Sequence, residues 1–118
     1  MKVSIVMRRG YTEEYWVKKK LVKEYGEWGV VKAAIGQRTA DFLVIKNGKI
    51  VKVVEVKKTK KKRWRPKKRE IYQLLLIKQF CKVHNVPCEY WIREGRKRRV
   101  VPIEDVLRQV LKSDENEV

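Results

Sequence analysis

The chain has 118 residues, which suits one compact domain with a single core. Charged residues make up 38% of it and the formal net charge is +17, so we expect a polyanionic partner, nucleic acid first and an anionic membrane surface second. No apolar stretch is long enough to span a membrane, the N-terminal apolar run is too short for a signal peptide, and two cysteines make no disulfide framework. We therefore expect a cytoplasmic protein.

The first predicted element is a helix over residues 12–25, which ends at Gly26. Two acids occupy its first turn, where they suit the helix dipole. Its apolar stripe contains Val17, and one step of three residues back along that stripe reaches Glu14. We therefore expect Glu14 to face the core and Glu13 to face solvent.

Strands and helices share the rest of the chain. Three strands are predicted first, over residues 28–34, 41–45 and 50–57. A helix, two strands and a C-terminal helix follow, over residues 67–84, 88–93, 98–101 and from residue 103. The order αβββαββα predicts an α+β fold with a mixed central β-sheet flanked by helices. We expect one domain over residues 1–113 and an acidic, frayed tail over residues 114–118.

Three charged residues lie at one end of the predicted hairpin. Asp41 opens its first strand, while Glu55 and Lys57 close the second. Charges are costly on buried strands, so their presence points to a function. Two carboxylates on adjacent strands can hold Mg²⁺, which prefers oxygen ligands and keeps several waters. Lys57 shares a strand face with Glu55 and can hold an attacking water or neutralise a phosphorane, so the set predicts a metal-dependent phosphodiesterase site.

The site depends on the register of the hairpin. A plain two-residue turn at Asn47-Gly48 would place Asp41 and Glu55 on opposite faces of the sheet, because a slip of one residue flips every side chain. A three-residue loop over residues 46–48, or a β-bulge elsewhere in the pair, would return both acids to one face. We therefore predict that loop or a bulge.

Each of these residues has a simpler explanation by itself. Asp41 could be satisfied by the backbone at the start of its strand, and Glu55 and Lys57 could lie on a solvated edge strand. Taken together, with Glu14 directed at the same region, the residues favour the catalytic interpretation.

These residues resemble the motifs of the PD-(D/E)xK nuclease superfamily, and most closely those of archaeal Holliday junction resolvases. The resemblance is carried by Glu14, Asp41 and Glu55-Val56-Lys57, in the order helix, strand, strand, and by the basic segment Arg8-Arg9-Gly10 before the helix. It covers about residues 8–93. Two positions depart from the pattern: residue 40 is Ala where the superfamily often has Pro, and the loop 37–39 lacks the serine expected in a resolvase.

The resemblance implies a restriction-endonuclease-like fold and a Mg²⁺-dependent DNA endonuclease, with Mn²⁺ able to substitute. It implies Asp41 and Glu55 as metal ligands, Lys57 as the catalytic lysine, and Glu14 as a further acid that supports the metal or the water. It also implies a homodimer that makes paired cuts in a four-way DNA junction.

A strongly basic segment follows the hairpin, with ten basic residues among residues 57–69. No acid dilutes this run, so we expect it to contact phosphates. Trp64 within the segment either stacks on a base or packs on its own sheet, and the sequence does not choose between these. The candidate DNA-binding residues are Arg8, Arg9, Arg38, Lys58, Lys60, Lys61, Lys62, Arg63 and Arg65.

Other polar residues give weaker signals. Gln73, on the helix after the catalytic lysine, could lie near the site, but a surface position is favoured. Cys81, His84 and Cys88 supply three zinc ligands without an evident fourth, so buried thiols are favoured over a zinc site. Residues 96–99 form a second basic cluster, for which phosphate contact is slightly favoured over a solvated turn.

Two other functions remain open from the sequence. One is another DNA nuclease of the same superfamily, with a nicking, repair or restriction-like activity. The other is a basic nucleic-acid-binding protein without chemistry, but such a protein has no need of acids that face its DNA.

Overall fold

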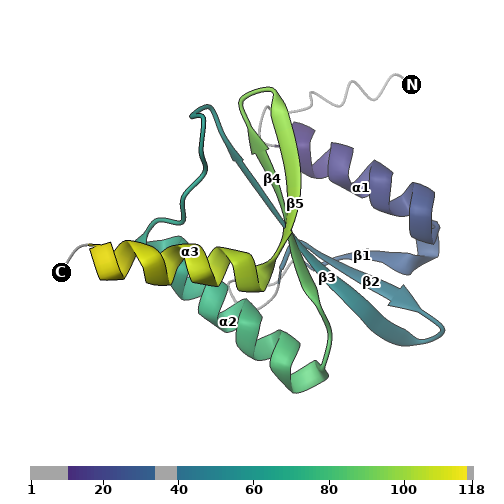
Figure 1. Ribbon diagram of the computed structural model, residues 1–118. Coiled ribbons are helices and arrows are strands. Elements are labelled where there is room, and N and C mark those ends of the chain that lie inside the picture. The colour runs from purple at the N-terminus through teal and green to yellow at the C-terminus, as the bar shows by residue number, and fades with distance from the viewer. Residues whose placement is uncertain (1–10, 34–39, 117–118) are drawn as a thin grey trace.

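The protein is described by a computed structural model that covers the backbone of residues 11–33 and 40–116 and the side chains within 13–33 and 40–112. Its elements follow the predicted order (Figure 1). They are α1 (Tyr11–Tyr25), the 3₁₀ turn η1 (Glu27–Gly29), β1 (Val30–Lys32), β2 (Phe42–Lys46), β3 (Lys49–Thr59), α2 (Lys68–His84), β4 (Cys88–Glu94), β5 (Lys97–Pro102) and α3 (Ile103–Asn116). The α+β prediction is therefore confirmed.

Two predicted boundaries are wrong. The first strand begins at Val30, because Trp28 lies exposed in the 3₁₀ turn instead of contributing to the sheet. At the other end, the backbone of α3 stays helical through Asn116, so the helix includes residues 114–116 that were assigned to a frayed tail.

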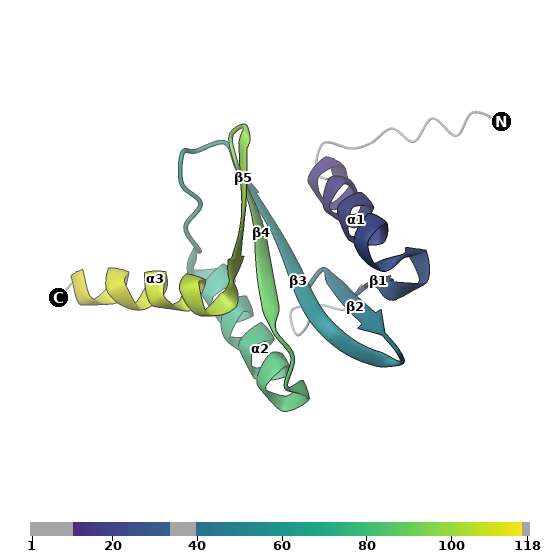
Figure 2. The ribbon, with the colours of Figure 1, turned by 45° about the vertical axis from the view of Figure 1, so that its right-hand side comes forward.

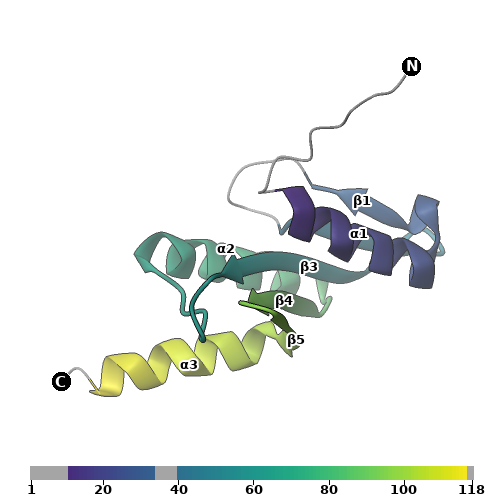
Figure 3. The same cartoon turned by 90° about the horizontal axis from the view of Figure 1, so that it is seen from above.

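A single five-stranded sheet, in the order β1-β2-β3-β4-β5, organises the fold. Neighbouring strands are antiparallel except for β3 and β4, which are parallel. Parallel neighbours need a crossover connection, and the basic segment and α2 supply it. Figure 3 shows β3 crossing the middle of the molecule, with α1 toward one of its ends and α2 and α3 toward the other.

The helices cover opposite faces of the sheet, with α1 on one face and α2 and α3 on the other (Figure 2). The core beneath α1 contains Val17, Leu21, Phe42, Val44 and Val54. The core beneath α2 contains Val53, Leu74, Ile77, Tyr90 and Ile92. Because side chains alternate along a strand, Glu55 and Lys57 share the α2 face with Val53.

A β-bulge sets the register of the hairpin. Asn47 and Gly48, with φ of 54° and 74°, form a two-residue turn closed by the pair Lys46 and Lys49. The predicted three-residue loop is therefore wrong. The pairing shifts between Val44 and Ile45, which leaves Val51 as an extra residue on β3. The alternative prediction, a bulge elsewhere in the pair, is confirmed.

The bulge returns the acids to one face. Beyond it, Leu43 pairs with Val53, and two more residues along each strand place Asp41 opposite Glu55. In the part of the chain that the structure describes, no helix is long and apolar enough to cross a membrane.

Candidate active site

The carboxylates of Asp41 and Glu55 each accept a hydrogen bond from the backbone across the hairpin. Glu55 Oε1 accepts a hydrogen bond of 3.1 Å from the Asp41 N–H. Asp41 Oδ2 accepts one of 2.8 Å from the Val56 N–H. The two carboxylates therefore lie side by side where β2 and β3 meet, and Glu55 is only 2% exposed.

The electrostatics of this pair favour a cation. Burial, followed by the negative charge of Asp41, raises the pKa of Glu55 to about 8, although the Lys57 ammonium acts in the opposite direction. Two carboxylates in a desolvated position repel each other, and a bound cation would relieve that repulsion.

Lys57 contacts three side chains at the same end of the sheet. Its Nζ lies 3.1 Å from Glu55 Oε2 and 3.4 Å from Glu70 Oε2. It also donates a hydrogen bond of 2.9 Å to Gln73 Oε1. The surface position favoured for Gln73 is therefore wrong. Glu70 was missed, although its spacing of three residues from Gln73 places both on one helix face.

The first turn of α1 is oriented differently from the prediction. Glu13 is the buried acid, 3% exposed, and it accepts hydrogen bonds from Arg93 at 3.2 Å and Arg98 at 2.9 Å. Burial opposes its ionisation, but these bonds and the arginine charges outweigh burial and lower the pKa of Glu13. Glu14 is partly exposed and pairs with Lys32 Nζ at 2.6 Å.

The error has a geometric reason. The buried stripe of α1 continues from Val17 back by four residues to Glu13, where the prediction stepped back by three. Among the described residues, no three metal-ligating side chains come together, so the structure does not join Glu14 to Asp41 and Glu55 as one cluster. The role of Glu14 in the site stays a prediction.

Comparison with known proteins bears on the fold. No protein-family model and no curated protein matches this sequence. Among solved structures, the chain is similar to Hjc of Archaeoglobus fulgidus, a Holliday junction resolvase from an archaeal hyperthermophile. The TM-score is 0.51 at 18% sequence identity, over 76% of this chain and 72% of that chain.

The chain has the fold of an archaeal Holliday junction resolvase. The predicted α+β fold, with a mixed sheet flanked by helices, is thus confirmed as resolvase-like. At this identity the likeness establishes the fold alone, and the chemistry must be argued from the residues of this chain.

On this resolvase-like fold, the basic segment forms the connection between β3 and α2 (Figure 1). Trp64 is buried in it, with its ring centroid 6.0 Å from that of Tyr90, and the backbone N–H of Trp64 donates a hydrogen bond of 2.7 Å to Glu94 Oε2. The structure therefore favours the core position of Trp64 over base stacking. The basic side chains on both sides of this anchor are exposed: Lys58, Lys60, Lys61, Lys62, Arg63 and Arg65. Arg8, Arg9 and Arg38 lie outside the described residues.

The second basic cluster holds carboxylates of this same chain. Arg98 binds the buried Glu13, and Arg99 Nε lies 2.8 Å from Glu94 Oε1. Arg98 also lies over the Trp16 ring, 3.9 Å from its centroid. These two arginines stabilise the packing of α1 and the β4–β5 hairpin, which the sequence did not indicate.

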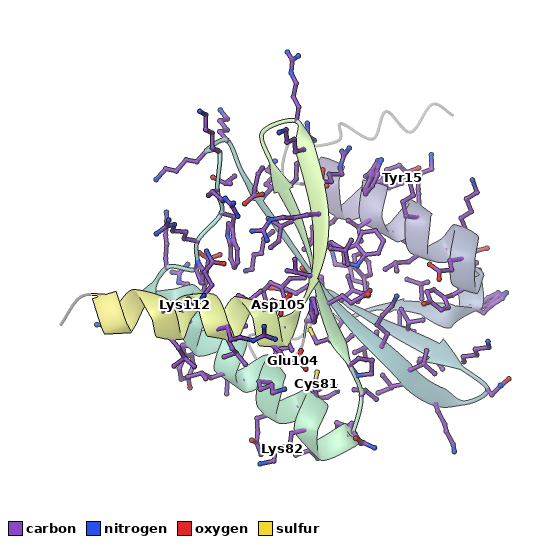
Figure 4. The ribbon with its side chains drawn as sticks, viewed as in Figure 1. Tyr15, Cys81, Lys82, Glu104, Asp105 and Lys112 are labelled. Carbon is purple, nitrogen blue, oxygen red and sulfur yellow. The ribbon has the colours of Figure 1, made fainter. Side chains whose placement is uncertain are left out.

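The two cysteines are buried free thiols, as favoured from the sequence. A hydrogen bond between them, from α2 to β4, lowers the pKa of Cys81 and raises that of Cys88. Figure 4 shows Cys81 near Glu104 of α3. The described residues hold no zinc cluster around them.

Proposed function

We propose that the protein is a metal-dependent, structure-selective DNA endonuclease that resolves four-way junctions by paired cuts from a homodimer. The observation that supports this best is the cross-strand pair of carboxylates Asp41 and Glu55, with Lys57 on the same strand face as Glu55. The resolvase-like fold and the net charge of +17 agree with a DNA substrate.

The donor set fits Mg²⁺, and Mn²⁺ would substitute. Asp41 and Glu55 supply hard carboxylate oxygens, and Mg²⁺ commonly uses one or two carboxylates with waters and substrate phosphate oxygens. The raised pKa of Glu55 reflects a buried carboxyl that lacks sufficient positive charge around it. Tyr90 pairs with Glu55 across β3 and β4. Its hydroxyl is buried without a hydrogen-bond partner in the described structure, so it can bond an ordered water.

When bound, the metal ion would polarise the phosphate and supply a hydroxide near neutral pH. Asp41 and Glu55 would hold it, with Glu14 as a further acid near the site. Lys57 would stabilise the negative charge that develops on the phosphoryl oxygens. The basic residues Arg8, Arg9, Arg38, Lys58, Lys60, Lys61, Lys62, Arg63 and Arg65 would bind the DNA backbone.

The homodimer follows from the proposed reaction, because two opposing strands need two active sites. A two-fold axis would place two copies of the Glu55 site on one basic face. Sedimentation of the protein with and without a four-way junction tests this assembly, and a monomer on DNA that still makes paired cuts would contradict it.

The central experiment compares synthetic four-way junction, flap and duplex substrates side by side, with and without Mg²⁺. We expect wild-type protein to cut the junction only with metal, and Asp41→Asn and Glu55→Gln to bind it without cutting. Unchanged cleavage by either variant would overturn the catalytic assignment. Equal cutting of plain duplex would favour another nuclease of this fold, and binding without cutting by wild-type protein would favour a non-catalytic DNA-binding protein.

A further inference from the structure

Three side chains surround the Lys57 ammonium, and two of them come from α2. We propose that Glu70 and Gln73 are positioning residues that keep Lys57 at the active site while Glu55 binds the metal ion. The proposal rests on the proposed nuclease function, because it concerns the lysine of that site.

The Glu55 carboxylate cannot bind the Lys57 ammonium and a metal ion at full strength at the same time. Its Oε2 lies 3.1 Å from Lys57 Nζ, and the same carboxylate is a proposed metal ligand. A metal ion draws electron density from that carboxylate and weakens its hold on the lysine. Lys57 has a flexible four-carbon stem, so without other partners its ammonium would move away from the phosphate.

The first two turns of α2 supply those partners. Glu70 Oε2 lies 3.4 Å from Lys57 Nζ, and Gln73 Oε1 accepts a hydrogen bond of 2.9 Å from it. Glu70 is itself fixed, because its Oε1 accepts a hydrogen bond of 3.1 Å from the Lys67 N–H at the start of the helix. One oxygen of Glu70 is thus tied to the helix start and the other is directed at the lysine.

Burial distinguishes this pair from an ordinary surface ion pair. The side chains of Lys57 and Glu70 are 15% and 22% exposed. Lys78 and Glu104 are also 3.4 Å apart, but their side chains are 39% and 51% exposed. Solvent screens the second pair more strongly, so only the first is placed to restrain its lysine. The pair of Lys78 with Glu104, which is labelled in Figure 4, has the same separation but greater exposure, so it serves as a matched control.

The test uses Glu70→Gln, which keeps an acceptor for the Lys67 N–H but loses the charge, and Gln73→Ala. The control is Glu104→Gln, which changes the net charge equally. The first measurement is the acetylation rate of Lys57 by N-acetoxysuccinimide, read by mass spectrometry with and without Mg²⁺. We expect Lys57 to react several-fold faster in Glu70→Gln and Gln73→Ala than in wild-type protein or the control, with the larger difference in Mg²⁺.

The second measurement separates chemistry from binding. In single-turnover cleavage of a four-way junction, we expect the rate of both α2 variants to fall roughly tenfold to a hundredfold, as for a misplaced catalytic group. Without Mg²⁺, the junction affinity of Glu70→Gln should match that of Glu104→Gln, and the affinity of Gln73→Ala should match that of wild-type protein. Glu70→Asp should recover part of the cleavage rate. Thermal unfolding identifies a variant that does not fold, in which case the other α2 variant decides the question.

The outcomes are distinct. Unchanged Lys57 labelling in the folded α2 variants overturns the proposal, even if cleavage falls. If wild-type protein cuts no DNA, the proposed function fails, but the labelling still decides whether Glu70 and Gln73 restrain Lys57.

Discussion

The carboxyl group of Glu55 has an unusual position for an acid. It is 2% exposed and lies against a second carboxylate, and its pKa is raised to about 8. Natural proteins accept such a cost where a ligand or a reaction repays it. Substitutions of single residues therefore test the site most directly.

Glu55→Gln should stabilise the metal-free protein by an amount that grows with pH. The folded pKa of Glu55 lies above the unfolded one, so the native state retains the Glu55 proton until about pH 8. The protein therefore loses stability as pH rises from about 4.5 to 8, by at most about 5 kcal/mol. Denaturant unfolding at pH 5 and pH 8.5 in EDTA measures the difference. An equal effect of the substitution at both pH values would contradict this account.

The same linkage predicts metal binding. A ligand must lose its proton before it coordinates, so Mg²⁺ should bind more tightly as pH rises toward 8, with release of protons. Calorimetry in buffers of different ionisation enthalpy measures that release. A Mg²⁺ affinity that is independent of pH between 6 and 8 would place the metal away from Glu55.

Substitutions of the two neighbouring acids of α1 should differ sharply in their effect on the free energy of unfolding. Glu13→Gln removes the anion that Arg93 and Arg98 share in a buried position, so we expect a loss of about 3 kcal/mol in the free energy of unfolding. Glu14→Gln weakens one partly exposed pair and should cost less than about 1 kcal/mol. Chemical denaturation at pH 7 compares them, and the reverse order would show that the helix is turned as the sequence suggested.

At the scale of elements, the hairpin of β2 and β3 decides whether a site exists. Its dipeptide Asn47-Gly48 forms the simple turn that the sequence suggests, and the extra residue Val51 corrects the register afterwards. The local sequence pattern could predict that the strand register had to shift for Asp41 and Glu55 to share a face. It could not locate the bulge, because that depends on how β3 packs between its neighbours.

Deleting Val51 should preserve Mg²⁺ binding and cleavage, because the pairs on either side of the bulge, Val44 with Lys52 and Ile45 with Ile50, then follow each other directly and Asp41 stays opposite Glu55. The matched change is Gly48→Ala, which strains a residue with φ of 74° but meets no atom within 4 Å and keeps the register. We expect it to cost about 1 kcal/mol and to leave cleavage intact. Loss of metal binding in a folded deletion variant would contradict this account of the register.

At the scale of the whole molecule, the charge distribution should govern DNA affinity. The basic segment is anchored by the buried Trp64, and its lysines are exposed. Replacing Lys60, Lys61 and Lys62 by Gln should weaken binding to junction and duplex alike, and should reduce the slope of log K against log salt by up to about 2.7. Fluorescence anisotropy over a salt series measures both, and an unchanged slope would exclude these lysines from the interface.

The periodicity of apolar residues was sufficient to predict the order of the elements, because helices and strands impose different spacings on any buried face. The same pattern predicted a charged hairpin with Asp41, Glu55 and Lys57 on one face. The pattern did not predict which side chains from distant parts of the chain contact one another. Contacts such as Glu13 with Arg98, Lys57 with Glu70 and Gln73, and Trp64 with Tyr90 form only when the sheet and helices pack, since the register of β3 and the rotation of each helix place these groups together.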